Sequence, residues 1–335
     1  MYLNKKIIAL LLLLSCNLCN AKTLDNVLAR AKLVCGVSQN LPGFATVDAK
    51  GVWSGLEVDI CRAVALAIFN DQSKVSLVAL DTKERFTALQ AGEIDLLARN
   101  DTWTMTRNTA LGLEFTAIML YDQQGFMVTK AANIQNIDNF TSGVVCVENT
   151  SNAQDRAKEF FSSRPQVILT SFDTVGDMLN AYNAQECNIL SANQSLLAGY
   201  RSRFSDAANH LILPNLFTKD PFAPAVRQGD TQWANLVRWI IYGLINAEEL
   251  GITKANVESF ATSKDPSIRQ FLGYHGNLYE SLQLKNTLMR NIIVQLGNYG
   301  EIFENNLGSN SKLKLNRLHN RLWTDGGLMY APVFR

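Results

Sequence analysis

The stretch VSLVALDTKERFTALQAGEIDLLA, residues 75–98, decides the fold of this 335-residue chain. It opens with an apolar run that predicts a strand. Asp81 with Glu84 three residues later forms a capping-box pattern, which predicts the start of a helix, and Gly92 predicts its end. The apolar run Ile94–Ala98 then predicts a second strand. Strand, helix and strand in this order predict two parallel strands joined by a crossover helix.

The same alternation continues on both sides of this unit. Upstream, Leu33–Val37 predicts a strand and Glu57–Phe69 predicts a helix with one apolar stripe. Downstream, a second unit alternates strands with helices: Val144–Val147, Asn152–Phe161, Val167–Thr170, Val175–Ala184, Asn188–Leu190 and Gln194–Arg201. Two such units predict two α/β lobes, each a sheet covered by helices.

Two extended segments, Gln123–Thr129 and Lys219–Val226, link the units, and the helical pattern Gln232–Glu249 follows the second link. We therefore expect the chain to leave lobe 1, build lobe 2 and return to lobe 1, with a cleft between the lobes. The expected hinges are Tyr121–Thr129 and Phe217–Arg227. The predicted division is a signal peptide at 1–21, lobe 1 at 22–124, lobe 2 at 125–222, the return of lobe 1 at 223–272 and a helical C-terminal extension packed on lobe 1 at 273–335.

The C-terminal extension carries an amphipathic pattern around Leu288–Phe303 and another over Lys312–Leu322. Both patterns predict surface helices. We find no motif with catalytic or binding chemistry in this part of the sequence.

The N-terminus has the pattern of a secretory signal. Lys5 and Lys6 precede the apolar run Ile7–Leu14, and Ala21 offers a small residue for cleavage. The apolar run is too short to span a membrane. We therefore predict export to the periplasm. Cys16 leaves a lipoprotein signal open as the less favoured alternative.

Composition narrows the class of protein. Apolar residues make up 47% and charged residues 18% of the chain, with a net charge of +1, which indicates an ordinary globular protein. This balance gives no reason to expect nucleic acid or an anionic surface as a partner.

Four cysteines remain outside the predicted signal: Cys35, Cys61, Cys146 and Cys187. An even number in an exported protein favours disulfides, and four cysteines allow three pairings. We favour Cys35–Cys61 and Cys146–Cys187, because each pair then lies within one predicted lobe. Metal binding is the weaker alternative, since the sequence has no C-x-x-C and its three histidines stand apart.

Motifs of catalysis are missing from the sequence. It contains no G-x-S-x-G, H-E-x-x-H, Walker loop or G-x-G-x-x-G. Its carboxylates are scattered and form no obvious acid–base pair. We therefore expect a binding protein that has neither enzymatic activity nor a cofactor.

Polar loops follow the predicted strands, where open α/β sheets bind their ligands. They are rich in hydrogen-bond donors, which suits a small polar ligand. The loops are Ser38–Phe44, Asp81–Thr82, Arg99–Thr104, Glu148–Asn152, Ser171–Asp173 and Ser191–Gln194.

The segment TWTMTR, residues 102–107, places three threonines on one edge if it is extended and ends at Arg107. A guanidinium forks two donors onto a carboxylate, and Thr102 and Thr104 would add further donors. The alternative is an edge strand that ends in a solvated arginine. Trp103 and Met105 would point the other way, and we expect them in the core.

Several motifs resemble the periplasmic solute-binding proteins of polar amino-acid ABC transporters, and above all their broad-specificity L-amino-acid branch. They are GVSQNLPGF at 36–44, GLEVDICRAVA at 55–65, RFTALQAGEID at 85–95, TWTMTR at 102–107, PAVRQGD at 224–230 and GNYGEIFE at 297–304. The resemblance implies a type II two-lobed fold that closes on an amino acid or related small carboxylate and delivers it to a membrane permease. We expect such a protein to be a monomer.

The resemblance also implies a ligand site. Arg107 would meet the ligand carboxylate, while Asn100 and Thr102 would help to fix the carboxylate and the ammonium. Ser151 and Asn152 would cap the carboxylate from lobe 2 with N–H groups at a helix start. The side-chain pocket would be lined by Ser38, Gln39, Leu41 and Thr82.

Two departures from the family pattern affect the expected ligand. Thr150 occupies the usual glycine position, and Asn193 occupies the position of the aspartate that binds the ammonium. A neutral amide compensates a buried ammonium poorly. We therefore hypothesise weak binding of amino acids, or binding of a carboxylate without an α-ammonium. Glu148, where the family has glutamine, is a weaker candidate for the missing charge.

Two alternatives remain open. One is a ligand sensor or surface protein that kept the fold and lost transport. The other is a lyase or dehydratase on the same fold, for which Glu148 and Asp101 are the candidate acid–base residues.

Overall fold

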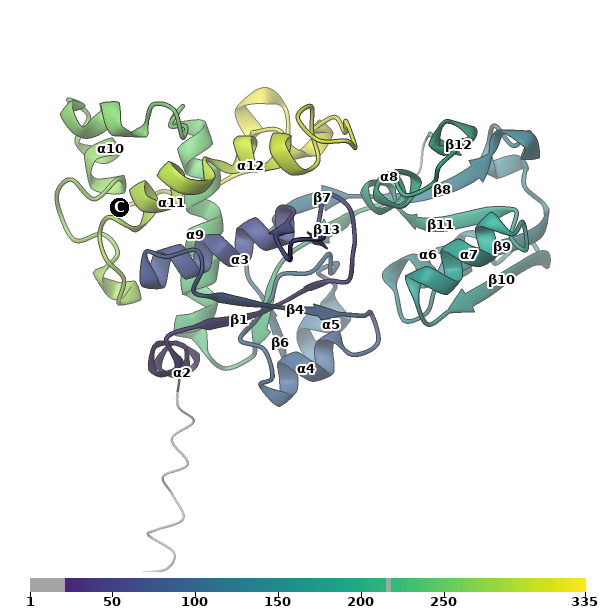
Figure 1. Ribbon diagram of the computed structural model, residues 1–335, viewed down its shortest axis with the longest axis horizontal. Helices are drawn as coiled ribbons and strands as arrows, with labels where there is room; N and C mark the ends of the chain where they lie inside the picture. Colours follow the sequence, from purple (N-terminus) through teal and green to yellow (C-terminus); the bar gives the residue numbers. More distant parts are fainter. Residues whose placement is uncertain (1–21, 215–217) are drawn as a thin grey trace, which may run out of the picture.

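The computed structural model describes residues 22–214 and 218–335. The predicted signal peptide with its cleavage site and Cys16, and also Phe217 of the second predicted hinge, lie outside the described residues. The described chain builds two five-stranded sheets that lie apart and are joined by a pair of crossing strands (Figure 1).

The first sheet forms lobe 1 and has the strand order β4-β1-β5-β14-β6. Strand β1 runs parallel to β4 and β5, whereas β14 is antiparallel to β5 and β6. Its strands are β1 (Leu33–Ser38), β4 (Val75–Leu80), β5 (Leu96–Leu97), β6 (Leu113–Phe115) and β14 (Ala225–Arg227), with a small hairpin of β2 (Thr46–Val47) and β3 (Trp53–Ser54). Its helices are α2 (Thr23–Arg30), α3 (Leu56–Phe69), α4 (Arg85–Ala91) and α5 (Met105–Ala110).

The second sheet forms lobe 2 and has the strand order β10-β9-β11-β8-β12. Strands β9, β10 and β11 are parallel, and β8 and β12 are antiparallel additions. Its strands are β8 (Gln124–Thr129), β9 (Ser142–Glu148), β10 (Gln166–Phe172), β11 (Ile189–Asn193) and β12 (His210–Ile212), and its helices are α6 (Asn152–Phe160), α7 (Val175–Asn183) and α8 (Gln194–Arg201).

The connection between the lobes is shorter than the sequence suggested. Strand β7 (Leu120–Asp122) pairs antiparallel with β13 (Asp220–Phe222), and these two strands carry the crossing. Most of the predicted first hinge is β8, a strand inside the lobe 2 sheet, and the second predicted hinge runs into β14 of lobe 1. An extended apolar segment that links two lobes has the same sequence pattern as a strand buried on both faces. Burial on both faces removes the alternation of apolar and polar residues that would identify a strand.

Residues 75–98 fold as the predicted β-α-β unit, with two differences from the prediction. Asp81 Oδ1 accepts hydrogen bonds from the backbone N–H groups of Lys83 at 2.9 Å and Glu84 at 2.8 Å. This local turn satisfies the donors that a capping box would use, so α4 begins only at Arg85. Gly92 ends the helix with φ 78°, as predicted. The expected strand Ile94–Ala98 is reduced to the two residues of β5.

Helices α9 (Thr231–Glu249) and α10 (Pro266–Phe271) precede the C-terminal extension, which contains α11 (Leu288–Leu296) and α12 (Tyr299–Asn306). Both α11 and α12 contact α3 of lobe 1. The prediction of one helix over Leu288–Phe303 is wrong, because Gly297 has φ 85° and Asn298 starts a new helix with a capping box.

The predicted helix over Lys312–Leu322 is also wrong. Lys314 has φ 52° and Leu318 has φ 47°, and these left-handed residues interrupt a right-handed helix. The region contains only the 3₁₀ turn η6 (Leu318–Asn320). Other 3₁₀ turns are η1 (Lys130–Ala132), η2 (Ile137–Asn139), η3 (Ala207–Asn209), η4 (Val257–Thr262), η5 (Glu280–Leu282) and η7 (Trp323–Asp325).

The C-terminal extension also touches the crossing strand β7. Asn320 accepts from the backbone N–H of Tyr121 at 2.6 Å and donates to the backbone carbonyl of Tyr121 at 2.9 Å. Tyr299 donates to the carbonyl of Met119 at 2.9 Å. The extension therefore holds the chain just before it enters lobe 2.

Both favoured disulfides are present. Cys35 on β1 bonds Cys61 on α3 with Cα atoms 6.1 Å apart, and Cys146 on β9 bonds Cys187 with Cα atoms 5.7 Å apart. Each bond lies within one lobe and is buried. In the part of the chain that the structure describes, no helix has the length and apolar character needed to cross a membrane.

Candidate ligand-binding site

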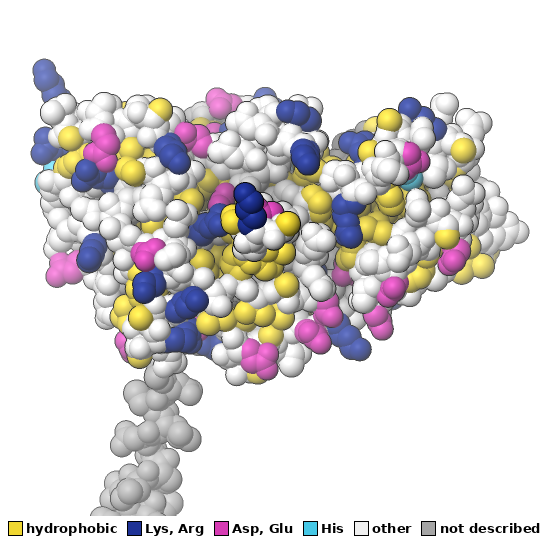
Figure 2. Space-filling model, viewed as in Figure 1, with side chains coloured by type: hydrophobic (Ala, Val, Ile, Leu, Met, Phe, Trp, Pro, Cys, Tyr) yellow, Lys and Arg dark blue, Asp and Glu magenta, His cyan; other side chains and the backbone are white. Residues whose placement is uncertain are grey.

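Two neighbouring cavities lie between the lobes, and each has walls from both. The large cavity has a volume of about 350 Å³ and the small cavity of about 30 Å³. Both are lined by Arg99 and Asn100 from lobe 1 and by Glu148 from lobe 2. The space-filling view shows the surface hollowed between the lobes and both signs of charge spread over the visible face (Figure 2).

The structure brings most of the predicted site residues together. The small cavity is lined by Thr82, Asn100, Thr102, Arg107, Ser151, Asn152 and Asn193. The large cavity is lined by Ser38, Gln39, Leu41 and Asn100. Thr104 lines neither cavity. Its hydroxyl accepts from the backbone N–H of Arg107 at 3.2 Å and caps helix α5.

The TWTMTR segment is not one extended row. Thr102 makes a single β-bridge with Phe222, and helix α5 begins at Met105. The helix turns Met105 to the surface, where 81% of it is exposed, and Trp103 is 36% exposed while it stacks on Phe115 at 5.8 Å. The prediction that both side chains lie in the core is therefore wrong.

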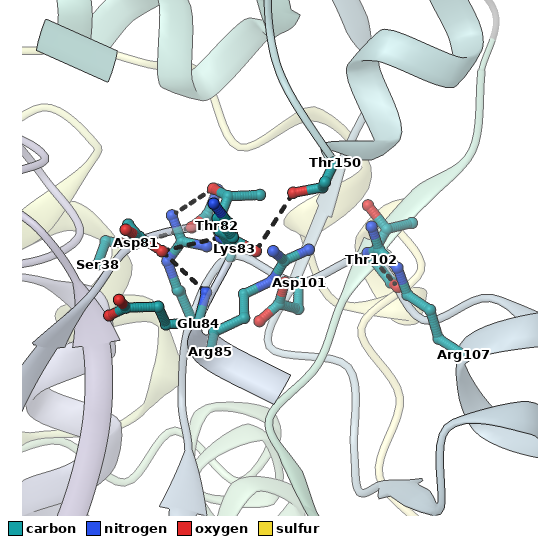
Figure 3. Close-up of polar contacts among 12 residues, drawn as sticks. Ser38, Asp81, Thr82, Lys83, Glu84, Arg85, Asp101, Thr102, Arg107 and Thr150 are labelled. Atoms are coloured by element: carbon teal, nitrogen blue, oxygen red, sulfur yellow. Dashed lines mark hydrogen bonds and ion pairs between the residues drawn. The ribbon is translucent and has the colours of Figure 1, made fainter. Parts of the chain in front are cut away.

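Helix α5 aims Arg107 at the small cavity. Its guanidinium donates to the carbonyl of Thr102 at 3.1 Å (Figure 3). It also lies 5.4 Å from the ring centre of Phe86. No carboxylate of the described residues lies within 4 Å of it. The remaining N–H donors of Arg107 are thus free to meet an anionic group.

A buried ion pair lines the small cavity. Arg85 donates to Asp101 at 2.5 Å, and the two side chains are 3% and 4% exposed (Figure 3). Burial lowers the pKa of Arg85, Asp101 opposes this shift, and the charges of Arg99 and Arg107 add to it. Three arginines, Arg85, Arg99 and Arg107, therefore share the wall of the small cavity with Asp101.

Glu57 supports the site from behind and was missed in the sequence. This buried carboxylate accepts from the Ser38 backbone N–H at 2.6 Å, the Ser38 hydroxyl at 2.8 Å and the Asn100 backbone N–H at 2.9 Å. It thereby fixes two residues that line the large cavity. A charged residue inside the apolar start of α3 was the available signal.

Burial raises the pKa of Glu57 from 4.5 to about 7, and the hydrogen bonds from Ser38 only partly oppose this shift. The native state then holds a proton that the unfolded chain has released, so this residue lowers stability as pH rises from about 4.5 to 7. We expect Glu57→Gln to remove this loss, worth at most about 3 kcal/mol above pH 7. Urea unfolding of both proteins at pH 5 and pH 8 measures the effect, and a stability difference that does not grow with pH would contradict it.

Lobe 2 reaches across the cleft at Thr82. The Thr82 hydroxyl donates to the carboxylate of Glu148 and accepts from Arg99 at 2.9 Å. The Thr150 hydroxyl lies 3.5 Å from the backbone carbonyl of Thr82 (Figure 3). The two lobes are therefore in polar contact at one wall of the cavities.

Thr150 has the left-handed backbone that its family position suggested, with φ 57°. It precedes Ser151, whose hydroxyl accepts from the backbone N–H of Gln154 at 3.0 Å and caps helix α6. A β-branched side chain at positive φ is strained, and the turn into α6 imposes this conformation.

Replacing Thr150 with glycine is expected to raise the free energy of unfolding by about 1 kcal/mol, because glycine adopts this backbone without strain. Gln185 has φ 61° but no β-branch, so Gln185→Gly serves as a control with a smaller expected gain. Urea denaturation measures both. If the free energy of unfolding of Thr150→Gly did not exceed that of the wild type, the proposed backbone strain at Thr150 would be contradicted.

Asn193 lies at the small cavity but turns its amide toward another buried group. Its Nδ2 donates to Asp220 at 3.0 Å, and Asn152 Nδ2 donates to the other oxygen of Asp220 at 2.6 Å. Asp220 belongs to the crossing strand β13. Its role was not visible in the sequence, because the fold brings it beside Asn152 and Asn193 from distant positions.

The described residues contain no group of three or more histidine, cysteine, aspartate or glutamate side chains that could hold a metal ion. The site is instead a polar cleft whose charges come from arginines and carboxylates of both lobes. Two α/β lobes, a two-strand crossing and a cleft between them are the architecture of the two-lobed solute-binding proteins.

Comparison with known proteins identifies the family. Residues 33–255 match the family described as bacterial extracellular solute-binding proteins, family 3, and the chain belongs to it. It is 43% identical to the general L-amino acid-binding periplasmic protein of Rhizobium johnstonii over 94% of each chain. It is 41% identical to the glutamate/glutamine/aspartate/asparagine-binding protein of Rhodobacter capsulatus, again over 94% of each.

A solved structure is also similar over nearly the whole chain. The periplasmic binding protein of an ABC transporter from Brucella ovis, with glutathione bound, superposes with a TM-score of 0.92 at 42% identity. The match covers 94% of this chain and all of the other. The family match ends at residue 255, and the similarity to these three relatives extends over 94% of the chain.

Proposed function

We propose that this protein captures an amino acid, or a small solute that carries an amino-acid head group, and delivers it to the permease of an ABC transporter. The observation that carries this proposal is the unpaired guanidinium of Arg107 at the cavity that Ser151 and Asn152 also line. A carboxylate there would meet both a forked cation and the N–H groups at the start of α6. The relatives named above bind L-amino acids, which supports this ligand class.

The remainder of the ligand would occupy the large cavity. Its walls carry amides and a hydroxyl, from Ser38, Gln39, Asn40 and Asn100, next to charges of both signs. Such walls accept polar side chains of different charge, which favours broad rather than narrow specificity. In the proposed site, lobe 1 anchors the ligand through Arg107, Thr102 and Asn100. Lobe 2 caps it through Ser151 and Asn152.

Calorimetric titration tests the proposal. The panel contains the common L-amino acids and the 2-oxo acids that share their side chains, added to protein that has been unfolded and refolded to remove carried ligand. Binding of at least one amino acid with 1:1 stoichiometry is expected. Absence of binding across the whole panel would contradict the proposal, and mass spectrometry of the solute that co-purifies would then identify another class.

A small peptide is a second candidate ligand. The large cavity is lined by Arg99 and Arg203 as well as Asp81 and Glu148, so it offers partners to a second carboxylate and a second ammonium. The Brucella ovis relative holds glutathione. Titration with glutathione and with glutamate separates the two ligands, because tighter binding of glutathione would show that the large cavity accommodates the rest of the peptide.

We propose that no bond chemistry takes place in the cleft. Asp101 is held by Arg85 and Glu148 bonds Thr82, so each candidate acid–base residue already has a partner. Turnover of a bound solute, lost in Glu148→Gln, would instead favour the lyase alternative. We also propose that the protein is a periplasmic monomer, and the predicted signal peptide supports the location. The lack of a neighbouring permease gene would favour the sensor alternative.

A further inference from the structure

Asp220 is a buried carboxylate beside the small cavity. It is 1% exposed, and its two oxygens accept from three side chains. Asn152 donates at 2.6 Å, Asn193 at 3.0 Å and the Thr218 hydroxyl at 3.1 Å. Burial raises the pKa of Asp220, and the hydrogen bonds from Thr218, Asn193 and Asn152 oppose this shift by favouring the charged form.

The charge of Asp220 has no close cation among the described residues. None of their lysine, arginine or histidine nitrogens lies within 4 Å of it. Arg156 acts on it from a longer distance, and its own guanidinium pairs with Glu159 at 3.2 Å. The buried charge at this wall is therefore left to act on whatever enters the cavity.

Asp220 also decides how the two amides face. A carboxylate only accepts, so the NH₂ ends of Asn152 and Asn193 must point toward it. Their carbonyl oxygens then point away, and neither oxygen has a hydrogen-bond partner within the described part of the chain. Both residues line the small cavity together with Arg107. The cavity thus has a cationic side at Arg107 and two carbonyl acceptors backed by a carboxylate.

We propose that Asp220 selects ligands with an ammonium group, acting through the amides of Asn152 and Asn193. This inference rests on the proposed function, and Asp220 is a positioning residue that does not touch the ligand. Donation to a carboxylate polarises each amide, which strengthens its carbonyl oxygen as an acceptor. The negative charge missing at position 193 is thereby supplied one step behind it, from the crossing strand.

The consequence is a corrected expectation for the ligand. Asn193 by itself suggested a carboxylate ligand without an α-ammonium. With Asp220 behind it, an ammonium placed between the two amide oxygens gains two oriented acceptors and a nearby anion. A 2-oxo acid offers a carbonyl oxygen at the same place, and two acceptors facing each other repel.

The test compares two ligands with the same side chain. Calorimetry measures the Kd of the tightest-binding L-amino acid and of its 2-oxo acid, for the wild type and for Asp220→Asn. The wild type is expected to prefer the amino acid by about 100-fold or more. In Asp220→Asn the preference is expected to fall at least tenfold, since Asn152 and Asn193 no longer have a fixed orientation.

A charge exchange separates this role from a structural one. The double variant Asn193→Asp/Asp220→Asn keeps one carboxylate and one amide at the same two positions, and it is expected to recover the preference to within about threefold of the wild type. Asp95→Asn is the matched control. Asp95 is a buried carboxylate of lobe 1, bonded to Arg30 and to the backbone N–H of Val34, and it lines neither cavity.

Each outcome decides the inference. In the control, the two affinities should move together and leave the preference unchanged. A preference that survives in Asp220→Asn, or that the charge exchange fails to recover in a folded protein, would overturn the role of Asp220 while leaving the proposed function intact. A wild type that prefers the 2-oxo acid would overturn the inference outright, whereas a wild type that binds neither ligand overturns the proposed function itself.

Discussion

Replacing Arg107 with alanine is expected to weaken ligand binding by about 100-fold or more. A forked guanidinium on a carboxylate in a closed cleft is a charge-assisted pair, and truncating one partner of such a pair costs about 2–5 kcal/mol. Stability should change little, because Arg107 makes one backbone hydrogen bond and no ion pair among the described residues. Calorimetry with the tightest-binding ligand measures the loss.

Two variants on the same helix sharpen this test. Arg107→Lys keeps the charge but not the fork, so it should lose an intermediate part of the affinity. Met105→Ala removes a side chain that is 81% exposed and should leave binding unchanged. An Arg107→Ala protein that binds within about threefold of the wild type would remove Arg107 from the site.

Replacing Asp101 with asparagine is expected to lower the free energy of unfolding by about 3–5 kcal/mol. The change leaves Arg85 as an uncompensated buried charge, and Arg99 and Arg107 act on the same wall. Arg85→Met should cost less, because Asp101 then still has the other two arginines near it. In an isolated ion pair, the two single changes would cost similar stability. A larger cost for Asp101→Asn than for Arg85→Met indicates that several arginines depend on Asp101.

Urea denaturation of the two single variants measures this asymmetry. The pair Arg85→Met/Asp101→Leu is the control, since removing both charges should recover much of the loss. Equal costs for the two single changes would contradict the crowding of arginines. Excess chloride or acetate should stabilise Asp101→Asn more than the wild type, because either anion can approach the unpaired guanidinium groups.

The sequence predicted the fold in considerable detail because the strands and helices of both lobes keep clear periods. Strand Val75–Leu80 and helix Gln194–Arg201 have the predicted bounds. The predictions failed where local hydrogen bonds compete with a pattern. Asp81 delays the start of α4, and Gly297 divides the pattern over Leu288–Phe303.

The site was predicted in part, for a similar reason. Arg107, Ser151 and Asn152 follow strands and form part of short motifs, so their place at the cleft could be expected. Asp220 and Glu57 could not be assigned in this way, because they act on side chains that are far away in sequence. A motif identifies the residue that faces a ligand, whereas only the folded chain shows which residue orients it.

Through Asn320, the C-terminal extension restrains the connection between the two lobes. Both the N–H and the C=O of Tyr121 are held by this one amide, and the tail itself is packed on lobe 1. Tyr121 must therefore travel with lobe 1, so a rotation of lobe 2 has to be absorbed between Asp122 and β8 and along the returning strand β13. When fewer residues of the connection can change conformation, the rotation between the lobes is concentrated at those residues. We expect the pivot of this rotation at Asp122 and Asp220, and Asp220 is bonded to Asn152 and Asn193, two of the proposed ligand-binding residues.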